Sequence, residues 1–177
     1  MPSLKKILLL ISIGLFLNAC GPSALYNAAY RGNNQEVISL VANGKDINGK
    51  EGNGWTPLMI AAAEGHADTV KILLEKGADA NARNSYGRTA LMFASSYGFT
   101  QIAELLIQAG ADVNVIPTDK THKPALIAAA EEGRLDVVSL LLKHGADMKV
   151  TDSLGFDALF AAAVDGHNQV VELLLQK

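Results

Sequence analysis

The sequence predicts an all-α repeat solenoid of about five units, and two recurring residues are the basis for this fold class. Leucine recurs at positions 25, 58, 91, 126 and 159, and glycine recurs in step at 32, 65, 98, 133 and 166. Three of the four intervals are 33 residues and one is 35. A fixed period of this size indicates stacked repeats, in which each unit contacts only its neighbours. We therefore expect a protein that works through an extended surface rather than a buried catalytic pocket.

The composition permits one well-packed domain and argues against nucleic-acid binding. The chain has 177 residues, of which 49% are hydrophobic, and its formal net charge is −3. A nucleic-acid footprint requires clustered Lys and Arg, and no stretch of five like charges occurs in this chain. We expect no nucleic-acid partner.

The first 19 residues predict a secretory signal rather than part of the fold. Lys5 and Lys6 precede an apolar run from Ile7 to Leu17, which has the length of a signal-peptide core and is too short to span a bilayer. The run ends in Leu17-Asn18-Ala19-Cys20, which resembles the lipobox of bacterial lipoproteins. That resemblance implies cleavage before Cys20, diacylglycerol on its sulfur, and a short tether over residues 20–23.

The alternative is an ordinary signal peptide in which Cys20 has no role. We favour the lipoprotein because Cys20 is the only cysteine and stands where the motif requires it. Gly21 follows it, instead of the Asp that marks inner-membrane retention in enterobacteria. By that analogy we expect a periplasm-facing protein in the cell envelope, at the outer membrane rather than the inner one.

The second repeat has the clearest helix signals. Thr56 suits an N-cap and Pro57 suits the first helical position, so a helix is expected to begin there and to end at Gly65. A second helix is expected to have Asp68 in its first turn, where the helix dipole favours negative charge, and to end at Gly77.

These residues together resemble the ankyrin repeat. Thr-Pro-Leu at 56–58, Gly-His at 65–66, Val-x-x-Leu-Leu at 70–74 and Gly-Ala-Asp-x-Asn at 77–81 all stand at the spacing of that family. The resemblance covers residues 24–177, with repeats at about 24–52, 53–85, 86–120, 121–153 and 154–177. It implies that each repeat is a helix–turn–helix followed by a β-hairpin finger.

Some segments depart from the repeat. The longer interval falls at residues 115–124, where His122 replaces a turn glycine and Pro124 replaces the capping Thr. We expect an altered, more exposed finger, and leave open whether it binds a partner or has drifted neutrally. The start at Asp157 retains a good N-cap. The last repeat keeps Phe160, Val170 and Leu173 in place of polar capping residues. We expect a monomer, with an end-on contact as the alternative.

The ankyrin resemblance also implies a partner-binding surface. In that family, partners are held by the finger tips and by the residues before the mid-repeat glycine. Aromatic residues at such positions are favoured anchors, and acidic residues attract basic partners. The alternative is that the aromatics pack on adjacent fingers and the acids only maintain solubility. The candidate residues are Tyr30, Arg31, Trp55, Glu64, Tyr86, Arg88, Tyr97, Glu131, Glu132, Phe156 and Asp165.

The sequence contains no recognisable catalytic constellation. His66 and His167 occupy family Gly-His positions, and the four histidines lack metal-ligand spacing. Glu131 and Glu132 are neighbours on a helix rather than carboxylates facing across a cleft. We expect no catalytic residue, no metal and no cofactor.

The sequence therefore predicts a non-catalytic, lipid-anchored module that binds a periplasmic or membrane protein through its concave face and finger tips. The alternative is an immunity-type inhibitor that occludes an envelope-acting toxin or lipase. A scaffold that supports envelope stress tolerance is a third hypothesis. The partner is expected to present a basic segment to the acidic C-terminal half.

Overall fold

The structure is a computed structural model that describes residues 23–177. Cys20 and the predicted signal segment, residues 1–19, lie outside the described residues. The described chain contains ten α-helices in five successive pairs. They are α2 (Ala24–Tyr30), α3 (Asn34–Ala42), α4 (Pro57–Glu64), α5 (Ala67–Glu75), α6 (Ala90–Tyr97), α7 (Thr100–Gln108), α8 (Ala125–Glu131), α9 (Leu135–Lys143), α10 (Ala158–Val164) and α11 (Asn168–Leu175).

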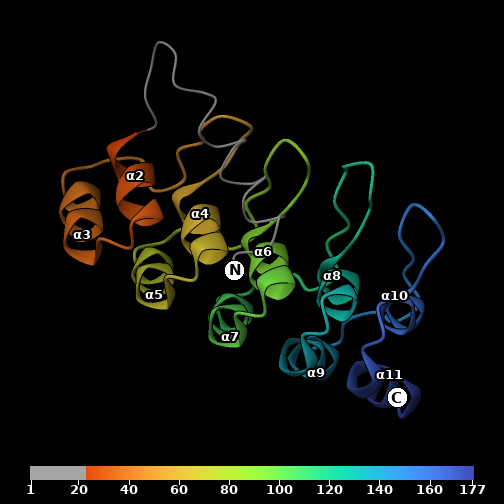
Figure 1. Cartoon of the computed structure of the whole chain (residues 1–177). Coiled ribbons are helices and arrows are strands. Elements are labelled where there is room, and N and C mark those ends of the chain that lie inside the picture. The colour runs from red at the N-terminus through yellow and green to blue at the C-terminus, as the bar shows by residue number, and fades with distance from the viewer. Residues whose placement is uncertain (1–22) are drawn as a thin grey trace.

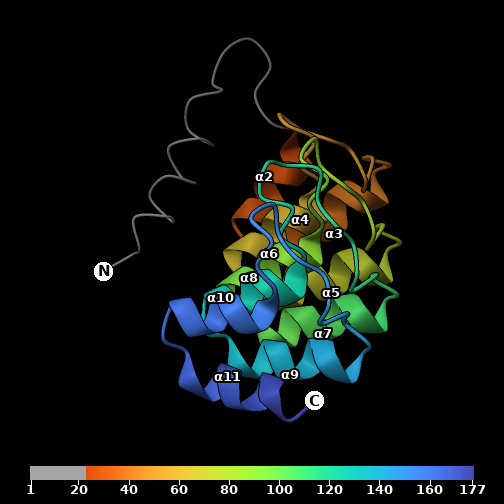
Figure 2. The same ribbon diagram turned by 90° about the vertical axis from the view of Figure 1, so that its right-hand side faces the viewer.

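The helix pairs stack side by side into two layers (Figure 1). The first helices of the pairs form an inner row, α2, α4, α6, α8 and α10, in which each helix packs on the next. The second helices, α3, α5, α7, α9 and α11, form an outer row. The connecting fingers project from one edge of the helix layers, as both views show (Figures 1 and 2). This arrangement confirms the predicted repeat solenoid.

The helix starts follow the predicted caps. The backbone N–H of Met59 donates to Thr56 Oγ1 at 3.3 Å, and Pro57 is the first residue of α4. Asp157 caps α10 in the same way, since its Oδ1 accepts from the N–H of Phe160 at 2.8 Å. Pro124, which has no side-chain acceptor, precedes α8 without a cap bond. Thr89 likewise makes no cap bond at the start of α6, so a threonine at the N-cap position does not by itself ensure the bond that Thr56 makes.

The core runs along the inner row without interruption. Leu58, Leu91 and Leu126 are buried, together with most of the alanines that follow them in α4, α6 and α8. Small alanine side chains let neighbouring inner helices approach closely, so that each repeat buries the apolar face of the one before it.

Asparagines at the finger bases connect successive repeats. Asn81 Oδ1 accepts from the backbone N–H of Asp112 at 2.8 Å, and its Nδ2 donates to the carbonyl of Gly110 at 2.8 Å. Asn114 repeats both bonds with Asp147 and Gly145. The Asn of the Gly-Ala-Asp-x-Asn motif is therefore a structural residue that fixes the repeat spacing.

The fingers pair with each other as well as within themselves. Regular strand pairing in the described chain is limited to an isolated bridge between Glu51 and Trp55. Neighbouring fingers are joined by backbone bonds from Ser85 to Asn53 (2.8 Å), Thr118 to Tyr86 (2.9 Å) and Ser153 to Thr121 (3.0 Å). The fingers therefore form a continuous row rather than separate hairpins.

The finger at 115–124 has both exposed and buried positions, and Ile116, Thr118, Lys120 and His122 are exposed. Val115 and Pro117 are buried, and Arg83 of the preceding finger donates to the carbonyl of Ile116 at 2.6 Å. His122 has φ +49°, the left-handed conformation that glycine adopts at this point in other fingers. Hydrogen bonds from Arg83 to Ile116 and from Thr118 to Tyr86 connect this longer segment to the preceding finger.

Candidate functional site

Seven of the eleven predicted site residues lie at the C-terminal ends of inner-row helices, and the other four lie in the fingers. Tyr30, Glu64 and Tyr97 are the last residues of α2, α4 and α6. Glu131 is the last residue of α8, and Arg31, Glu132 and Asp165 directly follow α2, α8 and α10. Some finger residues lie close to these helix ends. Lys123 forms an ion pair with Glu131, and the charge of Arg88 lowers the pKa of Tyr97, which burial raises. We call this surface the inner face; it comprises Tyr30, Arg31, Trp55, Glu64, Tyr86, Arg88, Tyr97, Glu131, Glu132, Phe156 and Asp165.

The aromatic residues of the inner face fall into two groups. Trp55 is half-buried and stacks on Phe93 with ring centroids 4.4 Å apart, and half-buried Tyr97 leans on Phe99 at 6.0 Å. Tyr86 and Phe156 remain 46% and 36% exposed. Trp55 and Tyr97 are therefore only partly open to solvent, because Phe93 of the next repeat packs on Trp55 and Phe99 of the same repeat packs on Tyr97.

Tyr86 stands at a finger tip held from three directions. Its backbone N–H donates to Asn84 Oδ1 at 2.9 Å, its carbonyl accepts from Thr118, and its hydroxyl is bonded by Asn53 Nδ2 at 3.2 Å. The exposed ring is thus fixed before any partner arrives, which lowers the entropy lost on binding.

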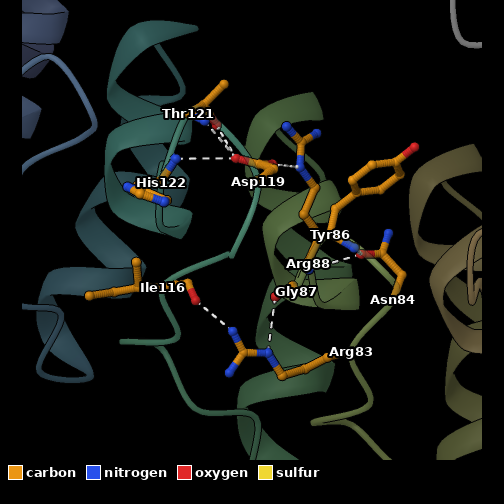
Figure 3. A network of polar contacts seen from close by, with 9 residues as sticks. All are labelled: Arg83, Asn84, Tyr86, Gly87, Arg88, Ile116, Asp119, Thr121 and His122. Carbon is orange, nitrogen blue, oxygen red and sulfur yellow. Dashed lines mark hydrogen bonds and ion pairs between the residues drawn. The ribbon is translucent and has the colours of Figure 1, made fainter.

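A polar network connects the finger that precedes α6 with the finger that precedes α8 (Figure 3). Asp119 accepts from Arg88 Nε at 2.5 Å, from the Thr121 hydroxyl at 2.6 Å and from the backbone N–H of Thr121 at 2.8 Å. Burial alone raises the pKa of Asp119, but the hydrogen bonds from Thr121 and Arg88 outweigh it and lower the pKa to about 2. The carboxylate is therefore ionised and structural, and Arg88 is already occupied by it.

Replacing Asp119 with asparagine is expected to make unfolding less dependent on acidity. A lowered pKa means that the carboxylate stabilises the fold above its unfolded value near 3.8 and ceases to do so as pH falls through about 2. At neutral pH the free energy of unfolding of the wild type should exceed that of Asp119→Asn by about 1–2 kcal/mol, a value reduced because the Arg88 partner is partly exposed to solvent. Denaturant unfolding at pH 7, 4 and 2 measures this difference, which should narrow between pH 4 and 2. A gap independent of pH would contradict the assignment.

The acidic C-terminal half of the inner face is largely neutralised within the chain. Glu131 pairs with Lys123 at 2.7 Å, and Glu132 lies 3.9 Å from the Arg134 guanidinium. Asp165 is exposed. The expected attraction of a basic segment to this half is therefore weakened, because Lys123 and Arg134 supply positive charge that the sequence reasoning did not pair with these carboxylates.

A different carboxylate dominates the N-terminal half. Burial raises the pKa of Tyr26 to about 12, and the charges of Glu64 and Glu51 act in the same direction. Burial also raises the pKa of Tyr97, again with a contribution from Glu64. Glu64 therefore lies within electrostatic reach of tyrosines on both neighbouring inner helices. Sequence reasoning missed Tyr26, although its i, i+4 spacing from Tyr30 in a predicted helix was a usable signal.

The histidines of the Gly-His motifs are structural, as predicted. His66 Nε2 donates to the carbonyl of Tyr30 at 2.9 Å, and His167 Nε2 makes the same bond to Glu131. Each imidazole crosses to the preceding repeat and packs on its mid-repeat glycine. Among residues 23–177, no group of three potential metal ligands comes together.

Two further findings concern the surface outside the inner face. In the last repeat, Leu154, Phe160, Val164 and Leu175 are exposed, and the ring of Phe156 is tilted against that of Phe160 with centroids 4.2 Å apart. Within the described part of the chain, no helix has the length and hydropathy needed to cross a membrane. The prediction of a monomer stays a prediction.

Comparison with known proteins agrees with the repeat geometry. A family model described as ankyrin repeats (3 copies) matches residues 3–84, 25–117 and 117–177. The chain is 49% identical over 47 residues to Probable E3 ubiquitin-protein ligase XBOS33 of Oryza sativa subsp. japonica, covering 27% of this chain and 9% of that protein. It is 43% identical over 51 residues to the human Mitochondrial disaggregase, covering 29% and 7%. It is 40% identical over 53 residues to zebrafish (Danio rerio) Notch-regulated ankyrin repeat-containing protein A, covering 30% and 47%.

The chain thus spans less than half the length of each of these relatives. Ankyrin repeats are in general protein–protein interaction modules and are typically non-catalytic. With the family model covering most of the sequence and five helix pairs stacked in register, this chain belongs to the ankyrin repeat family.

Proposed function

We propose that this protein is a non-catalytic binding module, lipid-anchored in the bacterial cell envelope, that holds a periplasmic or membrane protein against its inner face. The observation that carries the proposal is the fixed, exposed ring of Tyr86 at a finger tip. Rigid aromatic side chains with an exposed ring are preferred anchors at protein interfaces. Tyr97, whose neighbours include Arg88 and Glu64, continues this surface onto the inner helices.

The inner face is tested by replacing its two tyrosine anchors together. Tyr86→Ser with Tyr97→Ser should weaken partner binding at least about 100-fold, because two anchor residues are lost. The matched control is Ile38→Ser, which removes an exposed apolar side chain from the outer helix α3. Affinity for a co-purified partner measures the effect in variants shown to be folded. Retention of the partner by the double variant would reject the assignment, and a toxin or lipase as the partner would favour the inhibitor alternative.

The anchor is proposed at Cys20, on the basis of the lipobox resemblance. The first helix, α2, begins at Ala24, and three or four extended residues reach only about 10–14 Å. Acyl chains on Cys20 would therefore hold the first repeat almost against the headgroups, facing the periplasm, at the outer membrane by the Gly21 analogy.

Replacing Cys20 with serine is expected to release the protein from membranes or to block its processing. A bacterial lipoprotein carries two or three acyl chains, which suffice for firm anchoring, and none can be attached to the variant in the normal way. Membrane fractionation and intact mass measure the outcome. An unchanged mass and an unchanged membrane fraction would reject the lipid anchor without affecting the inner-face proposal.

A further inference from the structure

The carboxylates of the inner face differ in whether the chain itself supplies a counter-charge. Glu131 and Glu132 have Lys123 and Arg134, and Asp119 in the adjoining finger has Arg88. Glu64 makes no ion pair with any described residue, although it is half-buried at the end of α4. A half-buried carboxylate with no partner retains only part of its hydration and gains more than an exposed one from an incoming cation.

The surroundings of Glu64 are aromatic. Its helix, α4, lies between α2 and α6, which place Tyr30 and Tyr97 at the equivalent helix ends. Both tyrosines are half-buried, so part of each ring is open to solvent. A cation that reaches a carboxylate beside aromatic rings gains an ion pair and, over a ring face, a cation–π interaction.

The basic side chains nearest in the repeat register form no ion pair with Glu64 among the described residues. Arg88 is directed to Asp119, and Arg31, at the end of α2, forms no ion pair with Glu64. Burial is the main cause of the raised pKa values of Tyr26 and Tyr97. The charge of Glu64 acts in the same direction on both tyrosines, which lie on opposite sides of α4, while Arg88 lowers the pKa of Tyr97. Neither hydroxyl becomes a competing anion at neutral pH.

We infer that Glu64, flanked by Tyr30 and Tyr97, is a binding site for a lysine or arginine side chain of the protein partner. This inference rests on the proposed function and names the chemistry that the inner face recognises. It moves the basic contact from the C-terminal half, where the sequence placed it, to the N-terminal half, where the carboxylate is unpaired.

The test uses two synthetic peptides of equal length, one alternating arginine with glycine and one alternating glutamate with glycine. The full-length protein should bind the arginine peptide, and Glu64→Gln should weaken that binding about tenfold, because a charged hydrogen-bonding partner is lost. Glu104→Gln on the outer helix α7 removes the same charge away from the site and should change binding less than twofold. Glu64→Asp, which keeps the charge with a shorter reach, should lie between wild type and Glu64→Gln.

Each other outcome would overturn the inference. The proposed cation site would be rejected if the arginine peptide does not bind or if the glutamate peptide binds equally well. It would also be rejected if Glu64→Gln and Glu104→Gln weaken binding of the arginine peptide equally. Thermal unfolding of the variants controls for folding. If Glu64→Gln keeps the native partner at full affinity while the Tyr86 and Tyr97 variant loses it, the cation site fails and the proposed function stands.

Discussion

Replacing Gly133 with alanine is expected to destabilise the protein by about 2–5 kcal/mol, against about 1–2 kcal/mol for the same change at Gly145. Both glycines belong to the fourth repeat and both have positive φ, +67° and +81°. They differ in what a methyl group would meet. At Gly133 it would lie 2.5 Å from Nδ1 of His167, whereas at Gly145 nothing lies within 4 Å.

His167 cannot easily move away, because its Nε2 donates to the Glu131 carbonyl at 2.9 Å. The extra loss at Gly133 should therefore depend on this imidazole. In a His167→Ala background, Gly133→Ala should cost no more than Gly145→Ala does in the wild type, which is the non-additivity expected of residues in contact. Denaturant unfolding of the four variants measures this cycle. Equal costs at the two glycines in the wild type would contradict the packing of His167 on Gly133.

The second large effect is expected at the recurring leucine of the third repeat. Leu91 is fully buried, and α6 packs between α4 and α8. Leu91→Ala should therefore cost about 3–5 kcal/mol, the upper part of the range for a buried leucine. Leu159 occupies the same register in the last repeat but is only half-buried. Leu159→Ala should cost about half as much, because less apolar surface is buried there.

Amide hydrogen exchange measures which repeats lose protection in each variant. Leu159→Ala should expose amides of α10 and α11 while the first three repeats stay protected, since a repeat stack is stabilised by nearest neighbours. Leu91→Ala should lower protection on both sides of α6. Equal destabilisation by the two substitutions would contradict the difference in burial that distinguishes the central repeats from the last one.

Most of the fold could be predicted because each repeat carries its own signals. Thr56, Pro57, Gly65 and Asp157 act locally on the helix that they begin or end, so their roles were predictable without neighbours. Thr89 shows where local reasoning stops. It precedes α6 as Thr56 precedes α4, and both residues are buried, but the hydroxyl of Thr89 makes no cap bond.

The candidate site was predictable in position but not in charge or exposure. The repeat register is the basis for assigning Trp55 and Glu131 to the inner face. Their actual environments come from residues of other segments: Phe93 stacks on Trp55, and Lys123 neutralises Glu131. The pairing with Lys123 depends on how the longer finger folds over α8, which no local pattern specifies. A usable signal was nevertheless missed, because Asn84, Asp119 and Asp152 recur seven residues before the register leucine and bond to finger backbone in each case.

These environments give the inner face two kinds of residue. Trp55, Glu131 and Arg88 mainly build the surface, since each already has a partner within the chain. Tyr86, Phe156 and Glu64 keep an exposed ring or an unpaired charge. Partner recognition is therefore expected to depend most on the second group, and substitutions in the first group should act through stability.

The central claim, that the inner face is the partner-binding surface, is tested most directly by site-specific photo-crosslinking in cells that produce the protein. A photoreactive residue at Tyr86 or Tyr97 is compared with one at Glu104, on the outer helix α7. We expect one and the same crosslinked protein from Tyr86 and Tyr97 and none from Glu104. A partner that crosslinks from Glu104 but from neither tyrosine would contradict it.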